Sequence, residues 1–321
     1  MNLNISTQIK EASLRIAPFI RQTPLQYSHL ISENLGCKTY LKLENYQVTG
    51  SFKARGALNK ILKVTEENSD VHVVTASTGN HAAAVGYALR QVNMPGTIFL
   101  PENVSDTKVK SLSEYDVELK YIGNDSVDAE RAARDFALGN NYLYVSPYND
   151  LDIIAGQGTI GLEILNEIEP DTVFVPIGGG GLVSGIASYI SFNSEADITG
   201  CQPENSAVMH KSIEAGKLLD LPSLPTISDG TAGGVEHDSI TFPFCQELIK
   251  SWVDVSEQSI IGALKSIILE HHMMVEGSAG LALAALVKEK EKYQNKTVVL
   301  ILCGSKISNQ ILNKVLDNTE D

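Results

Sequence analysis

The segment Val173-Phe-Val-Pro-Ile-Gly-Gly-Gly-Gly-Leu-Val183 decides the fold class of this chain. Its first five residues are almost entirely apolar and predict a short buried strand, and the apolar residues that follow the glycines, 182–190, predict a buried helix. The turn between them consists of Gly178, Gly179, Gly180 and Gly181. A buried strand joined to a buried helix by a tight turn is typical of α/β proteins with a parallel sheet.

The same alternation of strand and helix extends in both directions along the chain. The apolar pattern predicts helices at 81–90, 107–115, 126–139, 157–168 and 257–271, and strands at 71–75, 96–100, 118–122, 142–145, 197–201, 252–255 and 297–302. We therefore expect an α/β fold with two open, mainly parallel sheets flanked by helices. A change in composition near Pro147 and Asn149 is the best candidate for a border between two α/β domains.

Composition argues against several classes of function. The 321 residues include 25 Lys and Arg against 39 Asp and Glu, and a net charge of −14 argues against binding of nucleic acid or of an anionic membrane surface. The four cysteines are far apart, so neither a zinc site nor a disulfide framework is indicated, and a cytoplasmic location is expected. Residues 172–194 carry no charge, but Pro176 and the glycines interrupt them, so we expect no membrane span.

The four glycines are a candidate anion site. Successive glycines allow backbone N–H groups to converge on a phosphate, and the start of a helix adds favourable partial charge. The Lys and Ser or Thr of a P-loop are missing, and the spacing G-x-G-x-x-G is not met, so nucleoside triphosphates and dinucleotides are disfavoured. The alternative is a flexible glycine turn with no ligand.

A second candidate anion site is Ser77-Thr-Gly-Asn-His81, between a predicted strand and an alanine-rich helix. Free amides at a helix start suit a carboxylate, and small side chains allow close approach of a ligand. Alternatively, Ser77 or Thr78 is a helix cap and His81 a surface residue. Two anion sites on two domains suggest a substrate bound between them.

The third candidate is Lys53, within Ser51-Phe-Lys-Ala-Arg-Gly56. Most lysines are solvated, but a lysine buried among apolar groups has a lowered pKa and is a nucleophile able to form a Schiff base. A Schiff-base lysine together with a phosphate cradle is the requirement of pyridoxal phosphate (PLP).

Five segments, in this order, carry a resemblance to a known family: Ser51-Phe-Lys-Ala-Arg-Gly56, Ser77-Thr-Gly-Asn-His81, Ile154-Ala-Gly-Gln-Gly-Thr159, the four glycines and Glu276-Gly-Ser-Ala-Gly280. The chain resembles the fold type II PLP enzymes of the threonine dehydratase and serine racemase family, whose fold is similar to that of the tryptophan synthase β chain. The segments span nearly the whole chain, and their ordered set is far more specific than any one of them.

The resemblance implies roles for individual residues. Lys53 is the Schiff-base lysine and the base that removes the substrate α-proton, with Thr78 as a second catalytic residue. The implied cofactor-binding residues are Phe52, Lys53, Asn80, Gly178, Gly179, Gly180, Gly181, Glu276 and Cys303. The implied substrate-carboxylate residues are Ser77, Thr78, Gly79, Asn80 and His81. Cys303 stands where the family places a Ser or Cys beside the pyridine nitrogen, although a small buried hydrophobe is the other interpretation of this thiol.

Departures from the family pattern narrow the range of reactions and ligands that we expect. Thr78 replaces the serine of serine racemases, which makes racemisation less expected than elimination. Val208 stands where a cation-binding acid occurs in metal-dependent relatives, so we expect no metal site. Lys306 replaces part of a frequent Gly-Gly-Asn and has no explanation from the sequence. The loop at 228–236 either wraps the cofactor face, with Asp229 or Glu236 near the substrate hydroxyl, or is solvated.

The resulting prediction is a PLP-dependent dehydratase, an ammonia-lyase that converts L-threonine, L-serine or both to a 2-oxo acid and ammonia. The alternatives are a serine or threonine racemase, a dehydratase of 3-hydroxyaspartate or of a hydroxyectoine-derived amino acid, and a non-catalytic cofactor-binding protein. We expect a large cofactor-binding domain of residues 1–49 and 147–321, and a small substrate-closing domain of residues 50–146. The resemblance also suggests a homodimer.

Overall fold

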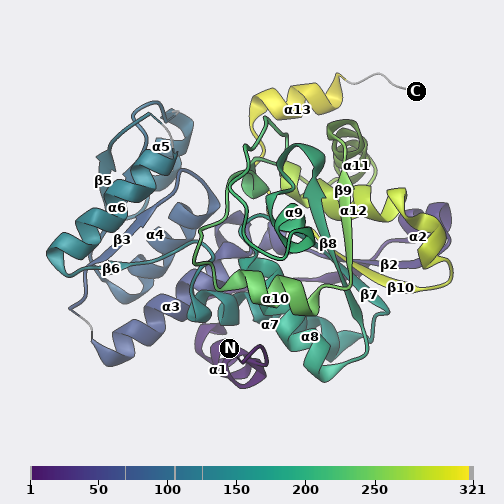
Figure 1. The fold of residues 1–321 in the computed structure, drawn as a ribbon, viewed down its shortest axis with the longest axis horizontal. Helices are drawn as coiled ribbons and strands as arrows, with labels where there is room; N and C mark the ends of the chain where they lie inside the picture. Colours follow the sequence, from purple (N-terminus) through teal and green to yellow (C-terminus); the bar gives the residue numbers. More distant parts are fainter. Residues whose placement is uncertain (1, 69, 105, 125, 318–321) are drawn as a thin grey trace.

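The computed structural model describes residues 2–68, 70–104, 106–124 and 126–317. Within this part of the chain, the strands form one sheet of six and one sheet of four. Figure 1 shows the smaller sheet with its helices on the left and the larger sheet on the right. The predicted α/β fold with two mainly parallel sheets flanked by helices is therefore confirmed.

The six-stranded sheet has the order β1, β2, β10, β7, β8, β9. β1 is antiparallel to β2, and the other neighbours are parallel. Its strands are β1 (Leu25–Tyr27), β2 (Lys38–Lys42), β7 (Thr172–Pro176), β8 (Asp197–Pro203), β9 (Ser251–Val255) and β10 (Thr297–Ile301). The central strand β7 is buried along its whole length, which explains its continuous apolar sequence.

The four-stranded sheet has the order β5, β4, β3, β6 and is parallel throughout. Its strands are β3 (Val73–Ala76), β4 (Gly96–Leu100), β5 (Glu118–Tyr121) and β6 (Leu143–Tyr144). Its four strands come from one continuous stretch of chain, whereas the six-stranded sheet combines strands from both ends of the sequence.

Helices cover both sheets. They are α1 (Ser6–Ile16), α2 (His29–Leu35), α3 (Lys53–Glu67), α4 (Asn80–Val92), α5 (Asp106–Leu112), α6 (Ser126–Asn140), α7 (Leu151–Glu167), α8 (Gly181–Asn193), α9 (Val208–Glu214), α10 (Thr241–Leu248), α11 (Glu257–Leu269), α12 (Gly277–Lys288) and α13 (Asn309–Leu316). Short 3-10 helices are η1 (Glu44–Tyr46), η2 (Val48–Gly50), η3 (Glu204–Ser206), η4 (Asp229–Thr231) and η5 (Lys290–Tyr293). No helix among the described residues is long and apolar enough to cross a membrane.

Several predicted helix boundaries were wrong, and the helix expected at 107–115, for example, ends at Leu112. The helix expected at 257–271 ends at Leu269, and His272 has a backbone φ of 55°, a left-handed conformation that cannot continue a helix. The helix expected at 157–168 begins at Leu151 instead, because the Asp150 side chain caps it by accepting hydrogen bonds from the backbone N–H groups of Asp152 and Ile153.

The carboxyl ends of four parallel strands lead to the predicted site residues. β2 precedes Lys53, β3 precedes Ser77, β7 precedes Gly178, and β10 precedes Cys303. Ligands of open α/β sheets bind outside the carboxyl ends of their strands, so this arrangement is the expected place for an active site.

Candidate active site

Lys53 begins α3 and is held there by the end of β10. Ser51 forms an isolated β-bridge with Gly304, and the Phe52 N–H donates to the Cys303 carbonyl oxygen over 3.1 Å. The Lys53 amine donates to the Pro147 carbonyl oxygen over 2.8 Å. It lies 5.2 Å from the centroid of the Phe52 ring.

Burial lowers the pKa of Lys53 to about 8, although the neighbouring Glu276 and Cys303 side chains oppose this change. A lysine of ordinary pKa is almost entirely protonated near neutral pH. The lowered value leaves an appreciable fraction of Lys53 neutral, as a nucleophile or a proton acceptor requires.

The four glycines connect β7 to α8. Gly180 has a φ of +88°, and a Cβ placed there would lie 2.9 Å from Thr241 Cβ. A Cβ on Gly179 would lie 2.5 Å from the Tyr148 ring. Glycine is therefore required at both positions by the backbone conformation or by the close neighbour.

The start of α8 offers free hydrogen-bond donors. No side chain in the described part of the chain caps its first turn, which begins directly after Gly180. The first N–H groups of a helix have no partner within the helix and attract an anion. The glycine turn thus fits the phosphate of PLP, as the sequence predicts.

The segment from Ser77 to His81 joins β3 to α4. Ser77 Oγ accepts the Gly79 N–H over 3.2 Å, and Lys108 Nζ lies 3.4 Å from Thr78 Oγ1. A Cβ placed on Gly79 would meet no described atom within 4 Å, so there is open space beside the loop.

His81 points away from solvent. Its side chain is buried, and Nε2 lies 3.1 Å from the Val145 carbonyl oxygen. Burial lowers the pKa of His81 to about 3, and the charge of Lys53 lowers it further. The imidazole is therefore neutral, and its Nε2 donates its hydrogen to this carbonyl.

Asn80, Glu276 and Cys303 meet at the end of β10. Asn80 Nδ2 donates to Glu276 Oε2 over 2.7 Å, and Cys303 Sγ donates to Glu276 Oε1 over 3.7 Å. A Cβ on Gly304 would lie 2.6 Å from the Glu276 carboxyl group. Burial raises the pKa of the Cys303 thiol well above its usual value, and Glu276 raises it further, so the thiol is neutral.

Asn80 Oδ1 is buried and has no hydrogen-bond partner among the described residues. A buried amide oxygen without a partner is costly and fits a site completed by a ligand. This atom, the glycine turn and the Lys53 amine together fit PLP.

Several residues around this site were not singled out as site residues from the sequence. Tyr148 packs on the glycine turn, Pro147 accepts from Lys53, and Thr241 Oγ1 donates to the Gly179 carbonyl oxygen over 2.7 Å. The backbone N–H of Lys306 donates to Glu276, which gives the Gly304-Ser305-Lys306 segment a role through its backbone. The only sequence feature that drew attention to this region was the change in composition near Pro147, and it indicated a border between domains rather than a site.

A buried ion network supports α3 two residues after Lys53. Arg55 is fully buried and makes bidentate contacts to Glu44 at 2.8 Å and to Glu163 at 2.6 and 2.9 Å. Lys42, also fully buried, donates to Glu163 and to the Thr23 carbonyl oxygen. Burial disfavours the charged guanidinium, but Glu44 and Glu163 outweigh it and raise the pKa of Arg55.

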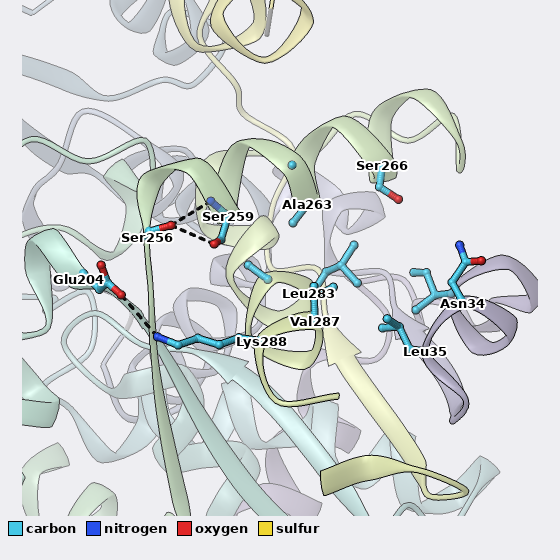
Figure 2. A pocket seen from close by; sticks show the side chains of 13 residues that line it. Asn34, Leu35, Glu204, Ser256, Ser259, Ala263, Ser266, Leu283, Val287 and Lys288 are labelled. Carbon is cyan, nitrogen blue, oxygen red and sulfur yellow. Dashed lines mark hydrogen bonds and ion pairs between the residues drawn. The ribbon is translucent and has the colours of Figure 1, made fainter. Parts of the chain in front are cut away.

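A cavity of about 600 Å³ lies elsewhere, between α2, α11 and α12 (Figure 2). Apolar side chains such as Leu35, Leu283 and Val287 line it, and Lys288 pairs with Glu204 at one end. None of the described residues that line it is a predicted site residue. We place the active site at Lys53, where the titratable groups converge, and not at this cavity.

The pyridoxal-phosphate dependent enzyme family matches residues 16–304. The chain belongs to this family. An L-threonine ammonia-lyase of Geobacter sulfurreducens is 36% identical over 315 residues, which cover 97% of this chain and 78% of the relative. The prediction of a PLP-dependent enzyme is thus confirmed.

Solved structures of the family agree with the fold. Maize serine racemase superposes with a TM-score of 0.91 at 31% identity and covers 98% of this chain and 97% of that chain. The processed form of threonine deaminase isoform 2 from Solanum lycopersicum has a TM-score of 0.91 at 30% identity and covers 97% and 88%. The PLP fold type II assignment is therefore confirmed.

Within the described residues, no group of three or more His, Cys, Asp or Glu side chains is placed to hold a metal ion. Val208, where metal-dependent relatives were expected to carry an acid, is a buried apolar residue at the start of α9.

Proposed function

We propose that this PLP-dependent enzyme is an ammonia-lyase that converts L-threonine, L-serine or both to a 2-oxo acid and ammonia. The observation that carries the proposal is the Lys53 amine, with a pKa lowered to about 8, in one site with the glycine turn and the Asn80–Glu276 contact. The names of relatives at 34–36% identity support the same reaction.

Bound PLP withdraws electrons from the α-carbon of the amino acid attached to it and so acidifies the α-hydrogen. Lys53 would hold the cofactor through Nζ, and the same nitrogen, as a free neutral amine, would accept the α-proton of the substrate. The α-hydrogen and the β-hydroxyl leave as water, and hydrolysis of the C–N bond then yields the 2-oxo acid and ammonia.

The cofactor-holding residues divide by role. Phe52 would pack beside the ring, the four glycines at 178–181 and the α8 terminus would hold the phosphate, and Asn80 would bind the phenolic oxygen. Cys303 would lie beside the pyridine nitrogen as a neutral thiol, and Glu276 fixes both Asn80 and Cys303. A neutral thiol does not favour a protonated nitrogen, which favours β-elimination over side reactions.

The substrate carboxylate binds the backbone amides of Ser77, Thr78, Gly79, Asn80 and His81. Neutral His81 positions this turn through its bond to Val145, while Thr78 presents its hydroxyl as the second catalytic group.

Residues 50–146 form the small domain that closes on the substrate, and residues 1–49 and 147–321 form the large domain. The protein acts in the cytoplasm. It is a homodimer, and light scattering of the purified enzyme tests this oligomeric state.

The experiment compares wild type with Lys53→Ala. Wild type should show a protein-bound PLP absorbance band and release 2-oxo acid and ammonia from L-threonine or L-serine. Lys53→Ala should lose the band and at least about 1,000-fold in turnover. A band without oxo acid overturns this reaction and directs assays to serine inversion and 3-hydroxyaspartate. No band in wild type supplied with PLP would overturn the whole site.

A further inference from the structure

A charged pair joins helix α6, which covers the small sheet, to the loop between η4 and α10. Arg134 lies on α6, which packs on β3, β4 and β6, and Glu236 lies between η4 and α10. We infer that the Arg134–Glu236 ion pair positions residues 147–149, and through them the Lys53 amine and the glycine turn. This inference rests on the proposed placement of PLP between these two groups.

Several contacts fix the orientation of Arg134 toward Glu236. Arg134 Nη2 lies 2.7 Å from Glu236 Oε2, with side chains 39% and 18% exposed. The guanidinium stacks over the Tyr144 ring at 4.3 Å and also contacts Glu130 on its own helix at 2.9 Å. Arg134 is therefore held in one orientation before it meets Glu236.

Asn149 connects the pair to the chain segment beside the site. Its Nδ2 donates to the same Glu236 oxygen, Oε2, over 3.0 Å. Its Oδ1 accepts the Ile240 N–H over 2.9 Å. Both ends of the Asn149 amide are thus fixed to the segment that carries Glu236.

Tyr148 connects the segment that carries Glu236 to the glycine turn. Its hydroxyl accepts the Glu236 N–H over 3.0 Å. Its ring lies 2.5 Å from the position of a Cβ on Gly179, and its own Cβ lies 2.8 Å from the position of a Cβ on Gly181. Any shift of residue 148 therefore moves the wall of the proposed phosphate cradle.

Pro147 completes the connection, because its carbonyl oxygen accepts from the Lys53 amine over 2.8 Å. Three consecutive residues thus touch the lysine, the glycine turn and the acid of the ion pair. The second oxygen of the acid, Glu236 Oε1, is buried and accepts no hydrogen bond from the described residues. Without Arg134, the partly buried carboxylate would lose its cationic partner, and we expect it to rotate toward water and release Asn149.

The test measures the rate at which the holoenzyme loses PLP after dilution, followed by the protein-bound visible absorbance. Arg134→Gln and Glu236→Gln should each lose PLP about threefold to tenfold faster than wild type. The double variant should lose it no faster than the faster single variant, because the two side chains act as one unit. Arg134→Lys, which keeps the charge, should restore part of the retention.

Arg131→Gln is the matched control, since Arg131 is an exposed residue of the same helix three positions away. It should lose PLP at the wild-type rate. A wild-type rate for Arg134→Gln, or fully multiplicative effects in the double variant, would overturn the inference. So would a fall in the thermal stability of the cofactor-free protein that alone accounts for the PLP loss. None of these readouts needs turnover, so a wild type that binds PLP but deaminates neither L-threonine nor L-serine refutes the proposed reaction and leaves this test intact.

Discussion

Asn80 donates its Nδ2 hydrogen to Glu276 Oε2 over 2.7 Å, although 196 residues separate them in sequence. The contact joins α4, which follows a strand of the small sheet, to the start of α12 beside the large sheet. Glu276 is 3% exposed, and burial raises its pKa to about 7, with Asn80 opposing and Asp229 reinforcing the change. A carboxyl group that is half protonated near neutrality thus links the two sides of the site.

This carboxyl group should make stability depend on pH. Because the folded pKa of Glu276, about 7, exceeds the ordinary 4.5, the folded state binds the proton more tightly, and the stabilisation is lost as pH rises through about 7. This difference between the two pKa values corresponds to about 3 kcal/mol of unfolding free energy. Glu276→Gln cannot titrate, so its unfolding free energy relative to wild type should rise by about this amount between about pH 4 and about pH 8.

Urea unfolding of the cofactor-free proteins at a series of pH values measures this difference. Glu102→Gln, a change at an exposed position, is the control and should run parallel to wild type. If the Glu276→Gln and wild-type curves also run parallel, Glu276 does not titrate in this range and the prediction fails.

The Lys53 amine should set the pH dependence of cofactor attachment. With a lowered pKa of about 8, half of the Lys53 amine is neutral at about pH 8. The neutral fraction grows as pH approaches this value and is nearly complete well above it. The rate of PLP attachment to cofactor-free protein should therefore rise with pH and level off above about 8, as stopped-flow absorbance measures. A rate that continues to rise toward 10.5, the ordinary lysine value, would show that Lys53 is not desolvated. Lys53→Ala supplies the blank.

The fold was largely predictable from the sequence because each strand and helix of an α/β chain carries its own apolar pattern. The strand predicted at 96–100 is β4 to the residue, and the quoted segment around the four glycines is β7, a turn and α8. The boundary near His272 was not predictable, because Ile267, Ile268 and Leu269 suggest a continuing helix and no glycine marks its end, although His272 adopts the left-handed backbone that usually favours glycine.

The candidate site was predictable only where a motif follows a strand. Lys53, Asn80 and the glycine turn each stand in such a motif. Tyr148 and the Arg134–Glu236 pair have no local pattern, since Glu236 lies 88 residues from Tyr148 and farther still from Arg134, and only the tertiary fold brings them together.

The glycine turn should tolerate no side chain at position 179. Gly179→Ala would place a methyl group 2.5 Å from the Tyr148 ring and push residue 148 off the turn, so we expect PLP affinity to fall at least about 100-fold. Gly262→Ala on α11 is the control: its Cβ meets no described atom within 4 Å, and alanine should stabilise the helix by about 0.5 to 1 kcal/mol. Titration of the cofactor-free proteins with PLP compares the two. Wild-type affinity in Gly179→Ala would show that Tyr148 moves freely.

Arg55 should be the most costly residue to replace in the ion network. Arg55→Met leaves Glu44 and Glu163 buried with Lys42 as the remaining cation of the network, an uncompensated negative charge. We expect a loss of about 3 to 5 kcal/mol in unfolding free energy, measured by urea unfolding. Arg55→Lys should recover only part of it, because an ammonium group cannot make the bidentate contacts to both carboxylates.

The ion pair of Arg15 and Glu66 provides the comparison, because the Glu66 side chain is 61% exposed. Glu66→Gln should cost less than about 1 kcal/mol, and added salt should reduce that cost further, because water and ions screen an exposed charge. The cost of Arg55→Met should be nearly independent of salt, since its partners are shielded from solvent. Equal losses in the two variants would mean that the buried network opens to water, and its role in fixing the first turn of α3 behind Lys53 would then be refuted.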